Sequence, residues 1–229
     1  MARRSTVQPS RSARQARRSV GILLGLLLAS HAALPAAAEA ELEGMALVDA
    51  LRAGGYNLYF RHAATDWSQD DRVTQSGDWT SCDPARIRQL SDQGRRTARQ
   101  VGEAMRALAI PVGRVFASPY CRAVETAEAM DLGPVETTAD VMNLRVADYF
   151  GGREAIVAMA RARLASPPAA GRNDVYVAHG NVARAATAVY PGEGEGLVFR
   201  PRDGDGFEFV GRLSPEMWRR LAESARDGR

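Results

Sequence analysis

Hydrophobic and polar positions alternate between two kinds of segment from residue 45 onward. Short apolar runs, bounded by turn residues, are typical of strands and occur at residues 56–60, 112–117, 135–137 and 174–178. The last of these runs has the composition of a strand that is buried on both faces. Between the runs, apolar residues such as Val101, Met105 and Leu108 recur at helical spacing. We predict helices over residues 45–51, about 91–110, 119–130, 155–164 and 181–189.

The C-terminal part of the chain predicts a hairpin followed by a helix. Residues 196–201 and 206–213 read as two strands separated by a turn rich in Asp and Gly. Ser214 and Pro215 then supply a cap residue and a first-turn proline for the final helix. Strands that alternate with helices predict an α/β fold, namely a three-layer α/β/α sandwich around a mostly parallel central sheet. One domain over residues 41–229 accounts for the whole pattern.

The first forty residues have a different composition. Six arginines precede an apolar run at residues 20–29, and small residues follow to Ala40. This pattern predicts a secretory signal peptide over residues 1–40, and the apolar run is shorter than the roughly 20 residues that span a bilayer. Arg17 and Arg18 leave twin-arginine export open beside the general secretory route. We expect a periplasmic or secreted protein with no stable membrane insertion after cleavage.

Removal of that segment changes the charge of the protein. All 30 basic residues are arginine, and residues 1–40 hold six of them and one glutamate, which leaves 24 arginines, 26 acidic residues and a net charge of −2. The remaining arginines are scattered along the chain. A nearly neutral protein without basic clusters is not expected to bind nucleic acid or a charged membrane surface. The sequence gives no indication of the oligomeric state.

Two cysteines, Cys82 and Cys121, remain in the predicted mature chain. In an exported protein such a pair suggests one disulfide, although a pair of free thiols fits the sequence equally well. The chain has no C-x-x-C motif, and its cysteines and histidines do not have the spacing of a structural zinc site. We therefore expect no metal site.

Polar clusters follow three of the predicted strands. They are Arg61-His62, residues 118–122 and His179-Gly180. Ligands of such sheets bind at the carboxyl ends of the strands, so we expect the three clusters to meet in one crevice. The sequence contains three histidines, and His31 lies within the predicted signal peptide. The other two, His62 and His179, both stand at the ends of predicted strands.

Two histidines and two arginines in one crevice favour a dianionic ligand. Alone, a histidine after a strand is commonly structural, and an arginine such as Arg122 is commonly a solvated surface charge. Together they suit a phosphoryl group, because guanidinium groups bind phosphate oxygens in pairs and a neutral imidazole can attack phosphorus.

Four motifs make the resemblance to a known family specific. They are R-H-A-A-T-D-W (61–67), L-S-D-Q-G-R-R-T-A (90–98), S-P-Y-C-R-A-V-E-T-A (118–127) and V-A-H-G-N (177–181). In this order they resemble the histidine phosphatase superfamily, also called phosphoglycerate mutase-like, over almost all of the predicted mature chain. One departure is Ala63, which stands where that family usually has glycine.

The resemblance implies a role for each matched residue. His62 would be the nucleophile, while Arg61, Arg122 and His179 would bind the phosphoryl oxygens without a metal or other cofactor. The expected activity is hydrolysis of a phosphomonoester through a phosphohistidine. The substrate would be a small phosphorylated metabolite or an envelope sugar phosphate. The alternatives are a catalytically weak or inactive binding protein for phosphorylated ligands and a phosphohistidine protein phosphatase.

The proton donor is the least defined part of this prediction. The chain lacks the recognisable acid motifs of the family, although protonation of the leaving oxygen calls for a nearby carboxyl group. Asp148 is the first candidate, because it follows Arg122 at about the distance where the mutase-like branch places its glutamate. The remaining candidates are Asp140, Glu154, Glu193 and Glu195.

Overall fold

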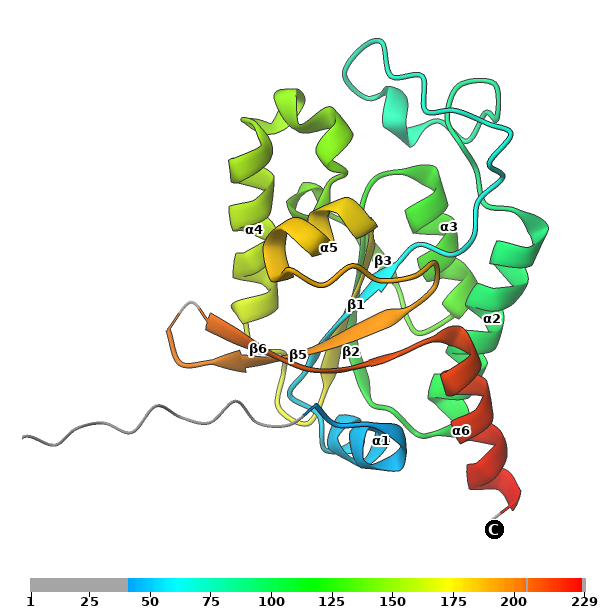
Figure 1. Cartoon of the computed structure of the whole chain (residues 1–229), viewed down its shortest axis with the longest axis vertical. Coiled ribbons are helices and arrows are strands. Elements are labelled where there is room, and N and C mark those ends of the chain that lie inside the picture. The colour runs from blue at the N-terminus through cyan, green and yellow to red at the C-terminus, as the bar shows by residue number, and fades with distance from the viewer. Residues whose placement is uncertain (1–40, 205, 228–229) are drawn as a thin grey trace, which may run out of the picture. The chain divides into compact units, whose positions relative to one another are not determined.

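A six-stranded sheet forms the centre of the protein (Figure 1). The structure is a computed structural model that describes residues 41–204 and 206–227, so the predicted signal peptide lies outside the described residues. The strand order is β3-β2-β4-β1-β5-β6. The strands are β1 (Asn57–Arg61), β2 (Val112–Ala117), β3 (Val135–Thr137), β4 (Asn173–Ala178), β5 (Gly196–Arg202) and β6 (Gly206–Leu213).

Four neighbouring strands of the sheet run parallel. β4 lies between β2 and β1 and pairs with both in parallel, and β2 pairs in parallel with β3. β5 and β6 form the antiparallel hairpin, and β5 runs antiparallel to β1. All six residues of β4 are buried, as expected for a strand covered on both faces. The mostly parallel sheet predicted from the sequence is confirmed.

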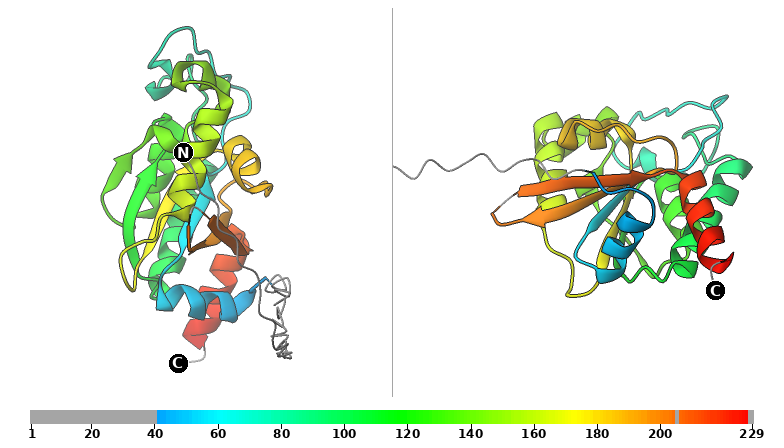
Figure 2. Two further views of the ribbon diagram at one scale, coloured as in Figure 1. Left: turned by 90° about the vertical axis from the view of Figure 1, so that its left-hand side faces the viewer. Right: turned by 60° about the horizontal axis from the view of Figure 1, so that its bottom comes forward.

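Helices cover both faces of this sheet (Figures 1 and 2). The helix α2 packs against α3 and α6, whereas α4 packs against α5. None of the helices in the described part of the chain is long and apolar enough to cross a membrane. The α-helices are α1 (Gly44–Ala53), α2 (Asp92–Ala107), α3 (Cys121–Met130), α4 (Arg153–Ala165), α5 (Gly180–Thr187) and α6 (Pro215–Asp227), and the 3₁₀ helices are η1 (Asp78–Thr80), η2 (Ala139–Val141) and η3 (Leu144–Phe150).

Several helix ends differ by one to three residues from the sequence prediction, and two of the differences have a clear local cause. α3 begins at Cys121 rather than at residue 119, because Tyr120 has an extended backbone and takes the N-cap position. α5 ends at Thr187 because Ala188 adopts a left-handed conformation, with φ of 65°. Both differences are local, and the three-layer α/β/α arrangement stands as predicted.

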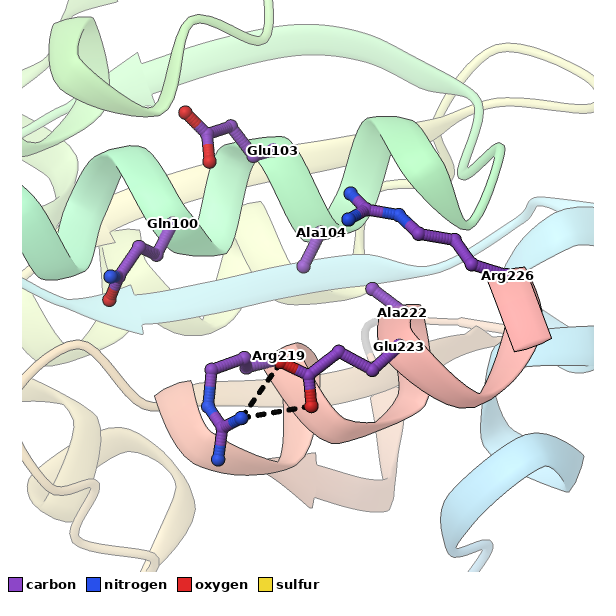
Figure 3. A pocket seen from close by; sticks show the side chains of 7 residues that line it. All are labelled: Gln100, Glu103, Ala104, Arg219, Ala222, Glu223 and Arg226. Atoms are coloured by element: carbon purple, nitrogen blue, oxygen red, sulfur yellow. Dashed lines mark hydrogen bonds and ion pairs between the residues drawn. The ribbon is translucent and has the colours of Figure 1, made fainter.

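The last helix is fixed by one large aromatic side chain and by small residues. Trp218 of α6 is fully buried, with its ring centre 6.5 Å from that of Phe60 in β1. Ala104 of α2 and Ala222 of α6 lie between the two helices, beside the ion pair of Arg219 with Glu223 (Figure 3). Small side chains at this contact let α2 and α6 approach closely.

A disulfide connects the long polar loop after β1 to the start of α3. The Sγ atoms of Cys82 and Cys121 are bonded, and their Cα atoms are 5.4 Å apart. Cys121 is the first residue of α3 and directly precedes Arg122. The bond therefore ties the loop to the helix end that carries one of the candidate phosphate-binding residues.

We expect replacement of both cysteines by serine to lower the free energy of unfolding by about 4 kcal/mol. The bond closes a loop between residues 39 apart in sequence, and a cross-link of that length restricts the unfolded chain by about this amount. Urea unfolding of the wild type and of the double variant measures the difference. Reductant should destabilise the wild type and leave the variant unchanged, whereas equal stability of the two oxidised proteins would contradict the expectation.

Candidate active site

The carboxyl ends of β1, β2 and β4 meet at one pocket. Twelve residues line it, from the loop after β1, from α3, from η3 and its preceding residue, and from the segments around α5. Arg61, His62, Arg122 and His179 are all among them, so the structure brings the four residues named from the sequence together. The full lining is Arg61, His62, Trp67, Asp71, Arg88, Arg122, Asn143, Arg145, His179, Gly180, Asn181 and Tyr190.

His62 is held so that one ring nitrogen remains free. Its backbone N–H donates to the carbonyl of Ala178 at 2.8 Å, which continues the pairing of β1 with β4. Its Nδ1 lies 2.9 Å from the carbonyl oxygen of Ala63, and because a carbonyl can only accept, Nδ1 carries the proton. The lone pair of the neutral ring is then on Nε2. The backbone of Ala63 is outside the left-handed region, so an alanine fits where the family usually has glycine.

The N-terminus of α2 packs directly on the segment that follows His62. The backbone N–H and the hydroxyl of Ser91 both donate to the carbonyl of Ala64, at 3.0 and 3.1 Å. Ser91 also caps α2 by accepting from the N–H of Gly94. A Cβ atom at Gly94 would lie 2.0 Å from the Ala64 oxygen, so only glycine allows this approach. The residue pattern at 90–98 thus positions the segment that follows His62.

His179 is fixed through both its backbone and its ring. The Tyr59 hydroxyl donates to the carbonyl of His179 at 2.8 Å and accepts from its N–H at 3.1 Å. The ring Nε2 lies 2.8 Å from the Ser118 hydroxyl, while the buried Nδ1 has no hydrogen-bond partner in the described part of the protein. If Ser118 donates to Nε2, Nδ1 is protonated and can donate to a ligand oxygen.

Burial and neighbouring cations keep both histidines neutral. The pKa of His62 is lowered well below its usual 6.5, chiefly because the ring is buried and then because of the cationic Arg122; the hydrogen bond to Ala63 acts in the opposite direction. The pKa of His179 is lowered for the same two leading reasons. The rings are almost perpendicular, with centres 5.5 Å apart. A neutral imidazole is the form that can act as a nucleophile.

Arg122 makes a buried ion pair that the sequence did not predict. Its guanidinium donates to both carboxylate oxygens of Asp71, at 2.7 and 3.0 Å, and the two side chains are 1% and 3% exposed. The backbone N–H of Arg88 donates to the same carboxylate at 3.2 Å. The centre of the Tyr120 ring lies 4.4 Å from the guanidinium carbon of Arg122 and 4.8 Å from the imidazole centre of His179. Asp71 thus holds Arg122 at the pocket.

Arg61 enters the pocket from the end of β1. Its guanidinium pairs with Glu193 at 3.2 Å and lies 5.4 Å from the ring centre of Tyr190. A Cβ atom at Gly180 would lie 2.9 Å from the Tyr190 ring and 3.2 Å from Cδ of Arg61. Glycine after His179 therefore leaves the space that Arg61 and Tyr190 occupy.

The family model of the histidine phosphatase superfamily, branch 1, matches residues 58–188. The chain belongs to the histidine phosphatase superfamily. None of the curated protein sequences matches it significantly.

Solved structures of several histidine phosphatases are similar at low identity. The protein histidine phosphatase SixA in complex with tungstate has 15% identity and a TM-score of 0.45, covering 70% of this chain and 97% of its own. The putative phosphohistidine phosphatase SixA from Agrobacterium tumefaciens has 12% identity and a TM-score of 0.47, with 70% and 99% covered. A mutant phosphoserine phosphatase from Entamoeba histolytica in complex with phosphoserine has 14% and 0.48, with 71% and 98% covered.

None of the proton-donor candidates named from the sequence is among the twelve residues that line the pocket. Asp148 is exposed and does not line the pocket, because η3 brings Arg145 to the lining and directs Asp148 to solvent. Of the remaining candidates, Asp140 pairs with Arg163 and Glu154 is exposed. Glu193 pairs with Arg61, and Glu195 pairs with Arg212. The carboxylate that does line the pocket is Asp71.

Other hollows and clusters lack these features. The pocket between α2 and α6 is lined by Gln100, Glu103, Ala104, Arg219, Ala222, Glu223 and Arg226, and no histidine is among them (Figure 3). Within residues 41–204 and 206–227, no group of three or more His, Cys, Asp or Glu side chains is arranged to hold a metal ion.

The buried neutral histidines predict a specific dependence of stability on pH. Because both pKa values are lower in the folded protein than the usual 6.5, the unfolded chain takes up more protons below about pH 6.5, and stability falls as the pH falls. Each histidine should contribute up to about 1.4 kcal/mol per pH unit to that slope. Urea unfolding between pH 7.5 and 5.5 should give a shallower slope for His62→Gln and for His179→Gln. Slopes equal to that of the wild type would mean that folding does not lower the pKa of these histidines.

Proposed function

We propose that the protein is a metal-independent phosphatase that hydrolyses a small phosphomonoester through a phosphohistidine on His62. The observation that carries this proposal is the hydrogen bond from Nδ1 of His62 to the Ala63 carbonyl, inside a pocket lined by four arginines. That bond leaves Nε2 unprotonated in a ring that burial keeps neutral. Of these arginines, Arg61 and Arg122 supply the positive charge that binds the phosphoryl dianion.

Phosphoryl transfer also requires that the equatorial oxygens of the transferred group are bound. Arg61 and Arg122 can bind them through charged N–H groups, and Nδ1 of His179 is buried and has no partner in the described structure. Because the reaction depends mainly on positioning and on neutralising oxygen charge, fixed donors of this kind can support it. In the first step Nε2 of His62 forms a bond to phosphorus as the bond to the leaving oxygen breaks.

Asp71 is our candidate for the proton donor. Its carboxylate accepts hydrogen bonds from both Nη1 and Nη2 of Arg122. A bound phosphoryl dianion would compete for Arg122 and repel the carboxylate, which favours uptake of a proton by Asp71. Asp71 would then give this proton to the leaving oxygen and later accept one from the water that hydrolyses the phosphohistidine.

We also propose that the protein acts outside the cytoplasm, in the periplasm or as a secreted protein. Two observations support this location: the signal-peptide pattern of residues 1–40 and the disulfide between Cys82 and Cys121. Disulfides persist in oxidising compartments and are rare in the cytosol. Its partner would be a small phosphorylated compound of that compartment.

The mature protein should hydrolyse an activated aryl phosphate in the presence of a chelator. His62→Gln should lower kcat by at least about 10³-fold while the far-UV spectrum stays unchanged, because a nucleophile is lost and the fold is kept. Steady-state assays with and without chelator measure both effects. Activity that disappears with the chelator would contradict the proposal, and phosphate binding without turnover would favour a binding protein instead.

Asp71→Asn should impair poor leaving groups far more than good ones. A proton donor contributes about 10²- to 10⁴-fold when the leaving oxygen needs a proton, so the loss should be large for alkyl phosphates and small for activated aryl phosphates. A comparison of kcat/KM over leaving groups of increasing basicity measures this. Asp148→Asn is the matched control and should resemble the wild type, whereas an equal loss for all leaving groups in Asp71→Asn would rule out proton donation.

A further inference from the structure

Two of the four pocket arginines have no carboxylate partner within the described structure. Arg61 pairs with Glu193 and Arg122 pairs with Asp71, whereas Arg88 and Arg145 make no ion pair with a described residue. Nε of Arg88 is also buried without a hydrogen-bond partner among the described residues. Arg88 and Arg145 therefore place positive charge beside the phosphate site that is not needed to bind the transferred phosphoryl group.

Arg88 is held in place by an aromatic ring instead of an anion. Its guanidinium carbon lies 3.9 Å from the ring centre of Trp67, whose side chain is 67% exposed. Stacking of this kind fixes the plane of the guanidinium and leaves its N–H groups free to bind an anion at the edge. The exposure of Trp67 places this pair toward the open side of the pocket.

Arg145 is brought to the same pocket by a hydrogen-bonded connection between η3 and α5. The Asn143 side chain accepts from the backbone N–H of Arg145 at 3.0 Å and from the side chain of Asn181 at 2.8 Å. Asn181 lies two residues after His179, so this connection places η3 beside the phosphate site. Arg145 is itself exposed and is free to meet a ligand from solvent.

The positive charge at this end of the pocket is only partly compensated. The pKa of Arg88 is lowered, first by burial and then by Arg122, with Arg145 acting in the same direction. Asp71 and Glu193 act in the opposite direction and do not cancel the effect. A second anion bound here would relieve this repulsion between like charges.

We propose that the substrate carries a second anionic group, a carboxylate or another phosphate, which binds Arg88 and Arg145 while the transferred phosphoryl group binds Arg61, Arg122 and His179. This inference rests on the proposed function, because it assigns the substrate class of the same pocket. It narrows the class to small organic phosphates with two negatively charged groups. Neutral alcohol phosphates would use only the inner half of the site.

Three matched compounds test this assignment: propyl phosphate, 3-(phosphonooxy)propanoate and propane-1,3-diyl bisphosphate. They share the chain and the leaving oxygen and differ only in the second group. For the wild type, kcat/KM should be at least about tenfold higher for the carboxylate compound, the bisphosphate or both than for propyl phosphate. A hydrogen bond to a charged group contributes about enough free energy for a tenfold difference. Arg88→Gln/Arg145→Gln should remove the preference and leave propyl phosphate within about threefold of the wild type.

Arg99→Gln is the matched control, because Arg99 is exposed on α2 and does not line the pocket. Titration calorimetry of the three compounds with His62→Gln provides a readout that does not depend on turnover. Equal affinities for all three, or a preference that survives in the double variant, would overturn the inference even if hydrolysis is observed. No hydrolysis of any compound, with the affinity preference intact, would reject the proposed function and keep the anion-binding assignment.

Discussion

The parallel pairing of β2, β4 and β1 is the constraint on which the rest of the site depends. It places Ser118, His179 and His62, which are far apart in sequence, at one edge of the sheet. Backbone hydrogen bonds continue the strand pairing by one residue beyond β1 and β2. The N–H of His62 donates to the carbonyl of Ala178, and the N–H of Ser118 donates to the carbonyl of Val177, both in the central strand β4. The backbone at both histidines is therefore positioned by the sheet and by its immediate continuation.

The buried ion pair of Asp71 with Arg122 connects this rigid edge to the loop after β1. Burial of two charges is costly unless they remain paired, so Asp71 and Arg122 stabilise each other only while nothing else binds the guanidinium. In the mechanism that we propose, a phosphoryl dianion replaces the carboxylate on Arg122, and Asp71 couples binding to proton transfer. The disulfide supports this arrangement because it joins the loop carrying Asp71 to the start of the helix carrying Arg122.

The sequence predicted the candidate site residues best where they lie next to a strand or a helix. His62, Arg122 and His179 could be found because each lies at the end of a strand or the start of a helix, where the direction of the chain is known. Asp71 could not, because its place is set by contacts with residues 17 and 51 positions away, which no local pattern contains. Spacing from Arg122 was also not enough to place Asp148, because η3 brings Arg145 rather than Asp148 to the pocket lining.

The central claim is that Nε2 of His62 takes the phosphoryl group, since Nδ1 is held by the Ala63 carbonyl. Rapid quenching in alkali during turnover, followed by proteolysis and ³¹P NMR of the labelled peptide, tests it most directly. We expect a base-stable, acid-labile phosphohistidine at His62, substituted on Nε2. Phosphate on Nδ1, on His179, or on no histidine while substrate is being hydrolysed would contradict it.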